Sequence, residues 1–441
     1  MVDERGLILA APASGSGKTT LTLGLLRALR RRGVDVAGAK HGPDYIDPGF
    51  HRAASGRASV NLDPWAMRPE TLAGSIAGIG AALILCEGAM GLFDGAGVGG
   101  DKGSTADLSA LSGWPVVLVV DARGQSASVA ALLRGFATHR GDVPIAGVIF
   151  NRVASARHEA MLRAATQAAL PDLRILGAVP RSAGLDLPSR HLGLVLAEEH
   201  PALEAFLDRA ADAMAAAIDL DALAALAQPS RFVGVPHTSA IAPLGQRIAL
   251  AQDCAFAFAY PHLIASWRRA GAEILPFSPL DDEAPGSNAD AVFLPGGYPE
   301  LHAGRLAAAT RFKAGLHRAA AWRRPIYGEC GGYMVLGRTL IDGDGIAHEM
   351  AGLLPIATSF ATPHRRLGYR QMTTLAGPWA GQSFRGHEFH FAIETESRTD
   401  TALFACCDAD RMLLEPAGAV LGTVFGAFVH LIDRARDPLI P

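Results

Sequence analysis

A glycine-rich run near the amino end of the sequence carries residue types that can bind phosphate. Residues 11–20 read Ala-Pro-Ala-Ser-Gly-Ser-Gly-Lys-Thr-Thr and join an apolar segment to an amphipathic one. Successive N–H groups of such a loop can cradle an anion, while Lys18 can reach the β and γ phosphates of a nucleotide and the Thr19 hydroxyl can bind Mg²⁺. Pro12 replaces the first glycine of the strict pattern. The residues predicted to bind the nucleotide are Gly15, Ser16, Gly17, Lys18, Thr19 and Thr20. The alternative is a strand-to-helix turn that binds nothing.

Acidic residues follow two later apolar segments. Residues 40–48 read Lys-His-Gly-Pro-Asp-Tyr-Ile-Asp-Pro, and residues 87–95 read Glu-Gly-Ala-Met-Gly-Leu-Phe-Asp-Gly. Mg²⁺ prefers oxygen ligands and keeps several waters, so Asp44, Asp47 and Glu87 are candidate metal ligands or catalytic groups. The alternative for each acid is a local hydrogen bond within a turn. The run Ser-Thr-Ala at 104–106 has two equal interpretations, an anion site and a helix N-cap.

A cysteine in the second half lies between small residues at a sharp turn. The run at 325–334 is Pro-Ile-Tyr-Gly-Glu-Cys-Gly-Gly-Tyr-Met, which is typical of a nucleophile elbow between a strand and a helix. We expect the helix N-terminus to lower the pKa of the Cys330 thiol, and the N–H of Gly331 to help bind an oxyanion. An earlier loop offers further N–H groups at Gly296 and Gly297 for the same oxyanion.

A nucleophilic cysteine also needs a base. The candidates are His387, His390 and His430, although a lone histidine after an apolar strand is more often structural, and spacing cannot show which of them reaches Cys330. Three other cysteines lack the glycine-flanked elbow and are interpreted as ordinary thiols: Cys254, Cys406 and Cys407.

The elements that must position these residues form two series. In the first half, short continuous apolar runs alternate with helix-length segments, as expected for parallel strands covered on both faces. These runs are 6–11, 34–39, 82–86, 116–120 and 145–150. After a Pro-, Ser- and Gly-containing stretch the alternation restarts, with strands predicted at 247–251, 273–277, 291–294 and 325–327. The fold class is therefore α/β with two domains, 1–228 and 246–441, joined by a linker at 229–245.

Composition limits the classes of partner and compartment. The 441 residues include 43 acids and 40 Lys and Arg, so nucleic acid is not favoured as a partner. Apolar runs stop far short of the ~20 residues of a membrane span, and the first strand leaves no room for a secretory leader, so we expect no membrane and a cytoplasmic location. Five cysteines give no disulfide framework.

Taken together, these motifs resemble the two-domain cobyrinic or hydrogenobyrinic acid a,c-diamide synthases of cobalamin biosynthesis. The resemblance covers essentially the whole chain. Besides the runs above, it rests on Asn-Leu-Asp at 61–63, Asn-Arg-Val at 151–153, Arg-His-Leu-Gly-Leu at 190–194 and Gly-Gly-Tyr-Pro-Glu-Leu-His at 296–302. It implies an N-terminal P-loop domain, similar to dethiobiotin synthetase, with a parallel sheet, and a C-terminal α/β domain similar to class I glutamine amidotransferases.

The family's chemistry implies ATP, Mg²⁺, glutamine and a corrin polycarboxylate, with phosphorylation of a corrin acetate and displacement of the phosphate by ammonia. Lys40 then lies near the transferring phosphoryl group, because Ala13 leaves no lysine in the loop where related dimeric ATPases have one. Asn151 resembles an adenine-reading asparagine. Cys330 becomes the nucleophile that forms a glutamyl thioester, with His430 as its base.

One position departs from the standard class I pattern. In the standard class I pattern, a glutamate two residues after the histidine orients the histidine. This chain has Ile432 at that position, so the orienting group is missing or comes from elsewhere. We expect a Cys–His dyad. In the resemblance, Arg385, His387, Glu388 and His390 are either substrate or domain-interface contacts or structural residues. A homodimer is the default for this kind of ATP domain.

Two rival interpretations remain. A cobyric acid synthase would amidate other corrin carboxylates, but that sister family generally lacks the Gly-Pro-Asp-Tyr-Ile-Asp run at 42–47. A P-loop regulatory ATPase with a non-catalytic C-terminal domain would not need the Cys330 elbow. The run at 61–67 resembles the members that act on the metal-free corrin.

Overall fold

The computed structural model describes residues 4–100, 102–182, 184–185, 189–190, 193–232, 241–397 and 401–436. The chain divides into two compact units. The first contains residues 1–65 and 72–237, and the second contains residues 66–71 and 238–441. Part of the predicted linker, 233–240, lies outside the described residues.

The first unit is built on one large sheet. Its strands run in the order β3-β2-β4-β1-β5-β6-β7, and all neighbours along this path are parallel. The strands are β1 (Arg5–Ala10), β2 (Val36–His41), β3 (Val60–Leu62), β4 (Leu83–Glu87), β5 (Val116–Asp121), β6 (Ile145–Val153) and β7 (Arg174–Pro180). A short strand, β10 (Gln228–Pro229), pairs antiparallel with the start of β1. Because β1 connects towards β2 while β4 connects towards β5, the strand order reverses around β1, which is where ligands bind in such sheets.

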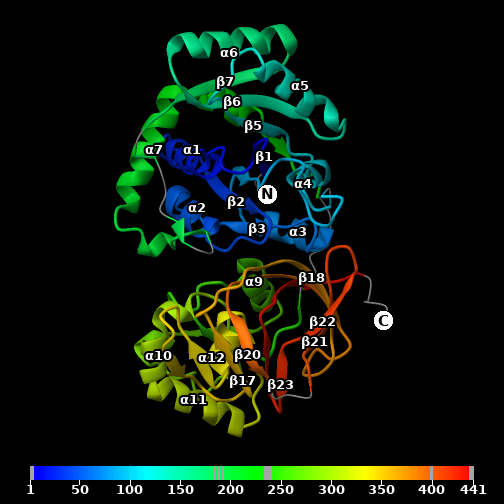
Figure 1. Cartoon of the computed structure of the whole chain (residues 1–441). Helices are drawn as coiled ribbons and strands as arrows, with labels where there is room; N and C mark the ends of the chain where they lie inside the picture. The colour runs from blue at the N-terminus through cyan, green and yellow to red at the C-terminus, as the bar shows by residue number, and fades with distance from the viewer. Residues whose placement is uncertain are drawn as a thin grey trace. The chain divides into compact units, whose positions relative to one another are not determined.

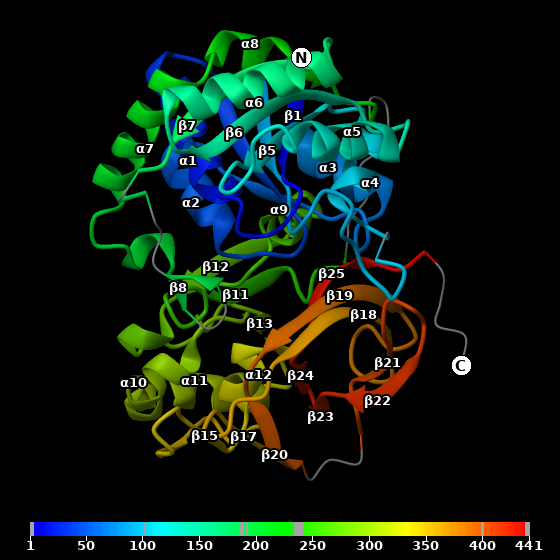
Figure 2. The same ribbon diagram turned by 45° about the horizontal axis from the view of Figure 1, so that its top comes forward.

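Helices cover both faces of this sheet. The helices are α1 (Lys18–Arg31), α2 (Asp47–Ser55), α3 (Pro69–Ala77), α4 (Thr105–Ser112), α5 (Val129–His139), α6 (Ala156–Ala169), α7 (Leu203–Ala217) and α8 (Leu220–Ala225). Figures 1 and 2 show α1, α2 and α7 side by side along one face, while α5 and α6 pack together on the other. Right-handed crossovers in opposite directions require this two-faced arrangement.

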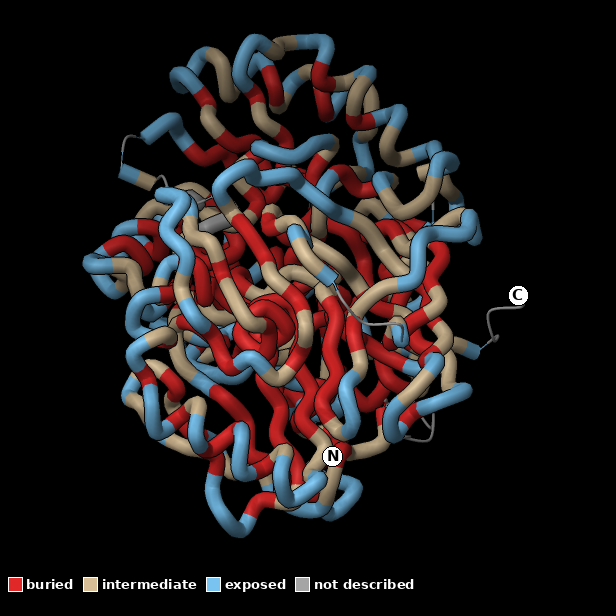
Figure 3. The backbone as a smooth tube through the Cα atoms, turned by 60° about the horizontal axis from the view of Figure 1, so that its bottom comes forward, coloured by how far each residue is buried: buried red, intermediate tan, exposed pale blue. Residues whose placement is uncertain are grey.

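Burial explains why the strands of the first unit are continuously apolar. Five of the six residues of β1 are buried, as are all residues of β2 and β4. In Figure 3 the buried stretches of the backbone, in red, lie mostly inside, and the exposed stretches, in pale blue, lie mostly at the outside. The five strands predicted for the first half are all present, whereas β3 and β7 were not anticipated.

The second unit has a central sheet with the order β12-β11-β13-β14-β24-β23. Its strands are β11 (Arg247–Ala251), β12 (Glu273–Phe277), β13 (Ala291–Leu294), β14 (Ile326–Glu329), β23 (Ala419–Leu421) and β24 (Val424–Ala427). Helices α9 (Pro261–Arg269), α10 (Ala303–Ala308), α11 (Thr310–Ala321) and α12 (Gly331–Leu336) connect them. The first four strands agree with the prediction that a strand-and-helix alternation restarts here.

Two further sheets of the second unit were not predicted. One contains β15 (Thr339–Ile341), β16 (Ala347–Glu349), β17 (Ile356–Ser359) and β20 (Ile393–Ser397). The other is antiparallel throughout and contains β18 (Arg366–Thr374), β19 (Ser383–His390), β21 (Phe404–Cys407), β22 (Leu413–Ala417) and β25 (His430–Arg434). The second unit is therefore an α/β sheet with two added sheets, and β25 carries the predicted base His430.

Candidate active sites

The glycine-rich loop lies between β1 and α1, at the carboxyl end of β1. Gly15 and Gly17 have φ values of 78° and 88°, a region that favours glycine. Gly17 also leaves no room for a side chain, since a Cβ there would lie 2.3 Å from the Asn151 amide nitrogen. Lys18 Nζ donates to the carbonyl of Met90 at 2.5 Å. Both glycines therefore have the backbone geometry that the phosphate-loop prediction requires.

A buried polar cluster centred on Glu87 adjoins this loop. Glu87 Oε1 accepts hydrogen bonds from Thr19 Oγ1 at 2.6 Å and Lys40 Nζ at 2.9 Å, while Oε2 lies 2.9 Å from His51 Nε2. Lys40 Nζ is also 2.5 Å from Asp47 Oδ2. Three strand ends thus bring together Thr19, Lys40, Asp47 and Glu87, all of which the sequence singled out. His51, on α2, was missed because a histidine inside a helix carries no motif.

Burial and neighbouring charges shift the pKa values in this cluster. Burial, followed by repulsion from Lys40, lowers the pKa of Lys18 to about 8. Burial alone would lower the pKa of Lys40, but the nearby carboxylates outweigh it and raise that pKa. Burial opposes ionisation of Glu87, yet Lys40 and His51 hold its pKa below the usual range. Burial and the neighbouring Asp44 raise the pKa of Asp47.

Two of the predicted site motifs also make the local hydrogen bonds of a turn and of a helix cap. Asp44 Oδ1 accepts from the N–H groups of Ile46 and Asp47, each at 2.8 Å, so one of its oxygens closes the turn before α2. Ser104 caps α4 in a reciprocal capping box with Asp107. The helix-cap interpretation of residues 104–106 is therefore the one that the geometry supports.

Asn151 and Arg152, at the end of β6, hold the glycine-rich loop from the side. Asn151 Nδ2 donates to the Ser16 carbonyl at 2.9 Å, and Arg152 Nη1 donates to the Gly15 carbonyl at 2.7 Å. The Asn151 Oδ1 atom accepts from the Arg152 N–H at 2.9 Å. Its role in reading adenine stays a prediction, since both ends of this amide bind protein backbone.

The predicted cysteine elbow has the strained backbone of that motif. Cys330 lies between β14 and α12 with φ 45° and ψ −102°, values that a residue with a Cβ rarely adopts. Its neighbours must be small: a Cβ on Gly332 would lie 1.9 Å from the Leu294 carbonyl oxygen, and one on Gly331 would lie 3.1 Å from the Gly297 nitrogen. The close approach of residues 331 and 297 brings together two of the three predicted oxyanion residues.

His430 is the histidine that lies beside Cys330. A Cβ added to Gly296 would lie 3.1 Å from His430 Nε2 and 3.3 Å from Cys330 Cβ, so the ring and the cysteine converge on one glycine. His387 sits opposite His430 in the β19–β25 register, and burial and the charge of His430 lower its pKa to about 3. His390 Nε2 lies 2.8 Å from Glu388 and its ring stacks on Phe428. Geometry therefore favours His430 among the three candidate bases.

Two polar residues of β19, Glu388 and His390, belong to a network with Arg370. Glu388 bonds to Arg370 at 2.7 Å in addition to His390. Burial raises the pKa of Glu388, but His390 and Arg370 outweigh it and lower that pKa to about 2. Arg385 of β19 lies opposite Gln371 of β18 in the strand register. These contacts support a structural role for Glu388 and His390.

The expected direction of the Cys330 pKa shift is wrong. Burial, followed by the charge of Glu300, raises the pKa of this thiol, and Glu388 and Glu329 add to the effect. The Gly331 N–H opposes them only in part. Helix α12 has six residues, so its N-terminus is too weak to offset burial among three carboxylates. Burial and these carboxylates therefore favour the neutral thiol of Cys330 over the thiolate.

A carboxylate stands beside His430 although Ile432 does not supply it. Glu329 Oε2 lies 3.5 Å from His430 Nδ1, and both side chains are buried. The sequence left open whether the group that orients His430 is missing or comes from elsewhere; the carboxylate beside the ring belongs to the residue that precedes the cysteine. Its position in the elbow motif was visible in the sequence, but its closeness to His430 was not.

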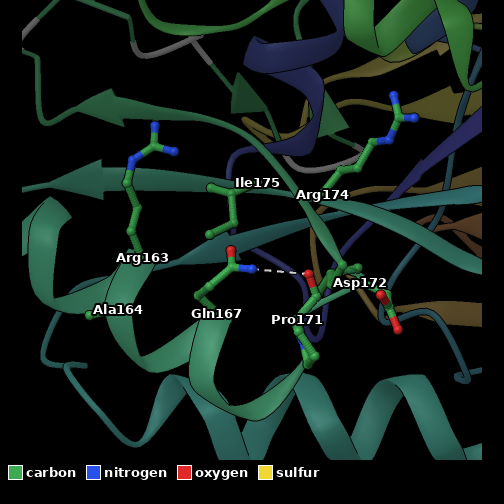
Figure 4. Close-up of a pocket in the computed structure, with 8 residues that line it drawn as sticks. Arg163, Ala164, Gln167, Pro171, Asp172, Arg174 and Ile175 are labelled. Carbon is green, nitrogen blue, oxygen red and sulfur yellow. Dashed lines mark hydrogen bonds between the residues drawn. The ribbon is translucent and has the colours of Figure 1, made fainter.

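Other features of the described residues do not form a second site. Figure 4 shows residues that line a hollow between α6 and the start of β7, among them Arg163, Gln167, Asp172 and Arg174. The volume of this hollow is about 510 Å³. The hollow lies at the amino end of β7, on the opposite edge from the carboxyl ends of the strands. Among the described residues, no group of three or more His, Cys, Asp or Glu side chains is arranged to hold a metal ion. No described helix is both long and apolar enough to cross a membrane.

Both halves of the chain match known families. Residues 7–195 match the CobQ/CobB/MinD/ParA nucleotide binding domain, and residues 247–438 match the CobB/CobQ-like glutamine amidotransferase domain. The run at 190–194 contains His191 and Leu192, which lie outside the described residues.

Curated relatives match over nearly the full length. A hydrogenobyrinate a,c-diamide synthase of Brucella anthropi is 56% identical over 437 residues, covering 97% of this chain and 98% of the relative. Proteins of the same name from Rhodobacter capsulatus and Rhizobium meliloti are 56% and 53% identical, each over 97% of this chain and at least 98% of the relative.

Proposed function

The chain belongs to the hydrogenobyrinate a,c-diamide synthase family, and we propose that it amidates the a- and c-acetate carboxylates of hydrogenobyrinic acid in cobalamin biosynthesis. Glutamine supplies the nitrogen and ATP supplies the driving force. The observation that carries this function is the presence in one chain of two sites, a phosphate loop with an acidic cluster and a cysteine elbow with a histidine.

In the second unit, the elbow fits hydrolysis of glutamine. Cys330 Sγ attacks the side-chain amide carbon of glutamine while His430 accepts the thiol proton. The same proton passes to the amide nitrogen, the C–N bond breaks, and ammonia leaves a glutamyl thioester. Water then cleaves the thioester to glutamate and restores the thiol. In this proposal the N–H groups of Gly297 and Gly331 bind the developing oxyanion, and Gly296 keeps space beside them.

In the first unit, the loop and the acidic cluster fit activation of a carboxylate. A substrate carboxylate oxygen attacks the γ-phosphorus of ATP, the bond to ADP breaks, and an acyl phosphate forms. Ammonia then attacks the acyl carbon, and the C–O bond to phosphate breaks. In this proposal Lys18 and Lys40 offset charge on the phosphoryl group, and Gly15, Ser16, Gly17 and Thr20 surround the phosphates.

The residues around the loop also fit a magnesium ion. Thr19 Oγ1 and Glu87 Oε1 are 2.6 Å apart, and Asp47 is held nearby by Lys40, so oxygen donors converge at the loop. Thr19 and Glu87 would hold the ion, with Asp47 and the second oxygen of Asp44 acting through water, because no three described acidic side chains are arranged to hold an ion by themselves. Mg²⁺ would supply charge neutralisation on the β and γ phosphates.

The experiment that tests this function is mass spectrometry of hydrogenobyrinic acid after incubation with the protein, ATP, Mg²⁺ and glutamine. We expect two carboxylates to become amides. Cys330→Ala should lose amidation with glutamine and retain it with free ammonia, because only the second unit is disabled. Amidation of the cobalt-containing corrin alone would assign the substrate to cobyrinic acid.

Two other outcomes would select rival functions. Amidation of corrin carboxylates other than a and c would indicate a cobyric acid synthase. No amidation with either nitrogen source, but ATP hydrolysis, would indicate a regulatory ATPase. The relatives named above disfavour both. The proposal extends to a cytoplasmic homodimer, which light scattering on the purified protein would test.

A further inference from the structure

Glu329 has no part in the proposed steps of glutamine hydrolysis, although it is buried next to Cys330. It ends β14, directly before Cys330, and its side chain is 2% exposed. A carboxylate buried this deeply costs free energy unless it is hydrogen-bonded or paired. The contacts that stabilise it therefore indicate what it does.

The two oxygens of Glu329 face different partners. Oε1 accepts from the Leu431 N–H and from the Tyr327 hydroxyl, each at 3.0 Å. Because these two donors fix Oε1, the other oxygen is directed at the imidazole, with Oε2 3.5 Å from His430 Nδ1. Leu431 directly follows His430, so the same carboxylate holds the backbone beside the histidine and faces its ring.

The opposite side of the ring faces the nucleophile. His430 Nε2 and Cys330 both approach Gly296, as described above. A histidine with one nitrogen toward a thiol and the other toward a carboxylate has the arrangement of a base with its orienting group. The distance of 3.5 Å is longer than a hydrogen bond, but such contacts often tighten only when substrate binds.

We propose that Glu329 is the positioning residue for His430: its carboxylate selects the imidazole tautomer with the proton on Nδ1, leaving Nε2 to accept the Cys330 proton. The acid thus comes from the strand that carries the nucleophile, and not from the position two residues after the histidine. This inference rests on the proposed glutaminase role of Cys330. Because burial favours the neutral thiol of Cys330, proton transfer must form an imidazolium, and the carboxylate of Glu329 would supply the negative charge that stabilises it.

The groups around the pair define which titrations an experiment can report. They are Cys330 itself, Tyr327 of β14, His387 and Glu388 of β19, and Glu300 in the turn after β13. His387, with its pKa lowered to about 3 by burial and by His430, stays uncharged in a neutral pH series. The acid limb of Cys330 reactivity therefore reports the base.

The test is the rate at which an electrophilic diazoketone analogue of glutamine alkylates Cys330 in the full chain, followed by peptide mass spectrometry across a pH series. For Glu329→Gln we expect a loss of roughly 10²- to 10⁴-fold and an acid limb moved to lower pH, because the amide favours the wrong tautomer and carries no charge. Glu329→Asp should recover part of the rate. Glu394→Gln is the matched control, since Glu394 also accepts from a tyrosine hydroxyl, at 2.9 Å, in the same unit.

The outcomes separate this inference from the function on which it rests. If the wild-type protein is not alkylated at Cys330, the glutaminase role itself fails. If wild-type alkylation occurs and Glu329→Gln retains both its rate and its pH profile, only the role of Glu329 is wrong. Should Glu329→Gln fail to fold, Glu329→Asp decides: an unchanged rate and acid limb would contradict positioning, because the shortened carboxylate cannot keep the same distance from the ring.

Discussion

A single methyl group added at Gly296 should separate His430 from Cys330. In Gly296→Ala the new Cβ would lie 2.4 Å from His430 Cε1, whereas ordinary contacts begin at 3.4 Å, so the ring must move by about 1 Å. A displacement of that size in a catalytic group costs about 100-fold in rate, or about 2.7 kcal/mol in activation free energy. We therefore expect glutamine-dependent amidation to fall by about this factor.

The assay compares two nitrogen sources in the same preparation. Amidation with free ammonia does not use His430, so Gly296→Ala should keep that activity while losing the glutamine-dependent one. Gly343→Ala is the matched control, because a Cβ at Gly343, in the same unit, meets nothing within 4 Å. Full glutamine-dependent activity in Gly296→Ala, or an equal loss in Gly343→Ala, would refute the placement of His430 beside the nucleophile.

Three further predictions concern the first unit. Burial and Lys40 lower the pKa of Lys18 to about 8, so ATP affinity measured by calorimetry should weaken as pH rises through about 8, where the ammonium loses its proton. Lys18→Arg should remove this pH dependence. A wild-type affinity that stays constant across this pH range would contradict the prediction. Glu87→Gln should abolish amidation with both nitrogen sources, because Glu87 contacts Thr19 and Lys40, and retained ammonia-dependent activity would refute that role. Gly24→Ala should lower the thermal midpoint by overpacking α1 against α7, where its Cβ would lie 2.7 Å from a backbone oxygen, at a cost of about 1–3 kcal/mol. Gly135→Ala, in open space on α5, should raise the midpoint slightly, so equal effects of the two substitutions would contradict the packing argument.

Local chemistry made the first unit largely predictable from sequence. The glycines of the phosphate loop require their own backbone angles, and the continuously apolar strands report burial on both faces. Asp47 and Glu87 were identified because each follows such a strand, and the parallel sheet brings strand ends to one edge. The same logic located the Cys330 elbow. Its neighbours must be small, because a Cβ added to Gly328 or Gly332 would lie less than 3.0 Å from other atoms. Lys40 was identified only through the family resemblance.

Long-range register explains what the sequence could not provide. Glu329 faces His430 because β14 pairs in parallel with β24, and the chain then turns into β25. Nothing in the spacing of residues 329 and 430 reveals this. The upward shift in the pKa of Cys330 also depends on Glu300 and Glu388, which arrive from distant segments.

The antiparallel sheets of the second unit were missed for a different reason. In β18 the first five residues are exposed or half-buried, so the strand lacks both the continuous apolar run and the clear alternation that predict a strand. Strand β22 is exposed along most of its length. Their pairing partners, rather than their own composition, stabilise these strands.

We propose that one chain transfers the amide nitrogen of glutamine to carboxylates activated by ATP. The most direct test of this transfer is to supply glutamine labelled with a heavy isotope at the amide nitrogen, together with ATP, Mg²⁺ and hydrogenobyrinic acid, and to analyse the corrin product by mass spectrometry. We predict that both new amides carry the label, and that omitting ATP or using Cys330→Ala leaves the corrin unlabelled. Labelled ammonia that accumulates while the corrin carboxylates stay unchanged, or labelled amides formed without ATP, would contradict the account.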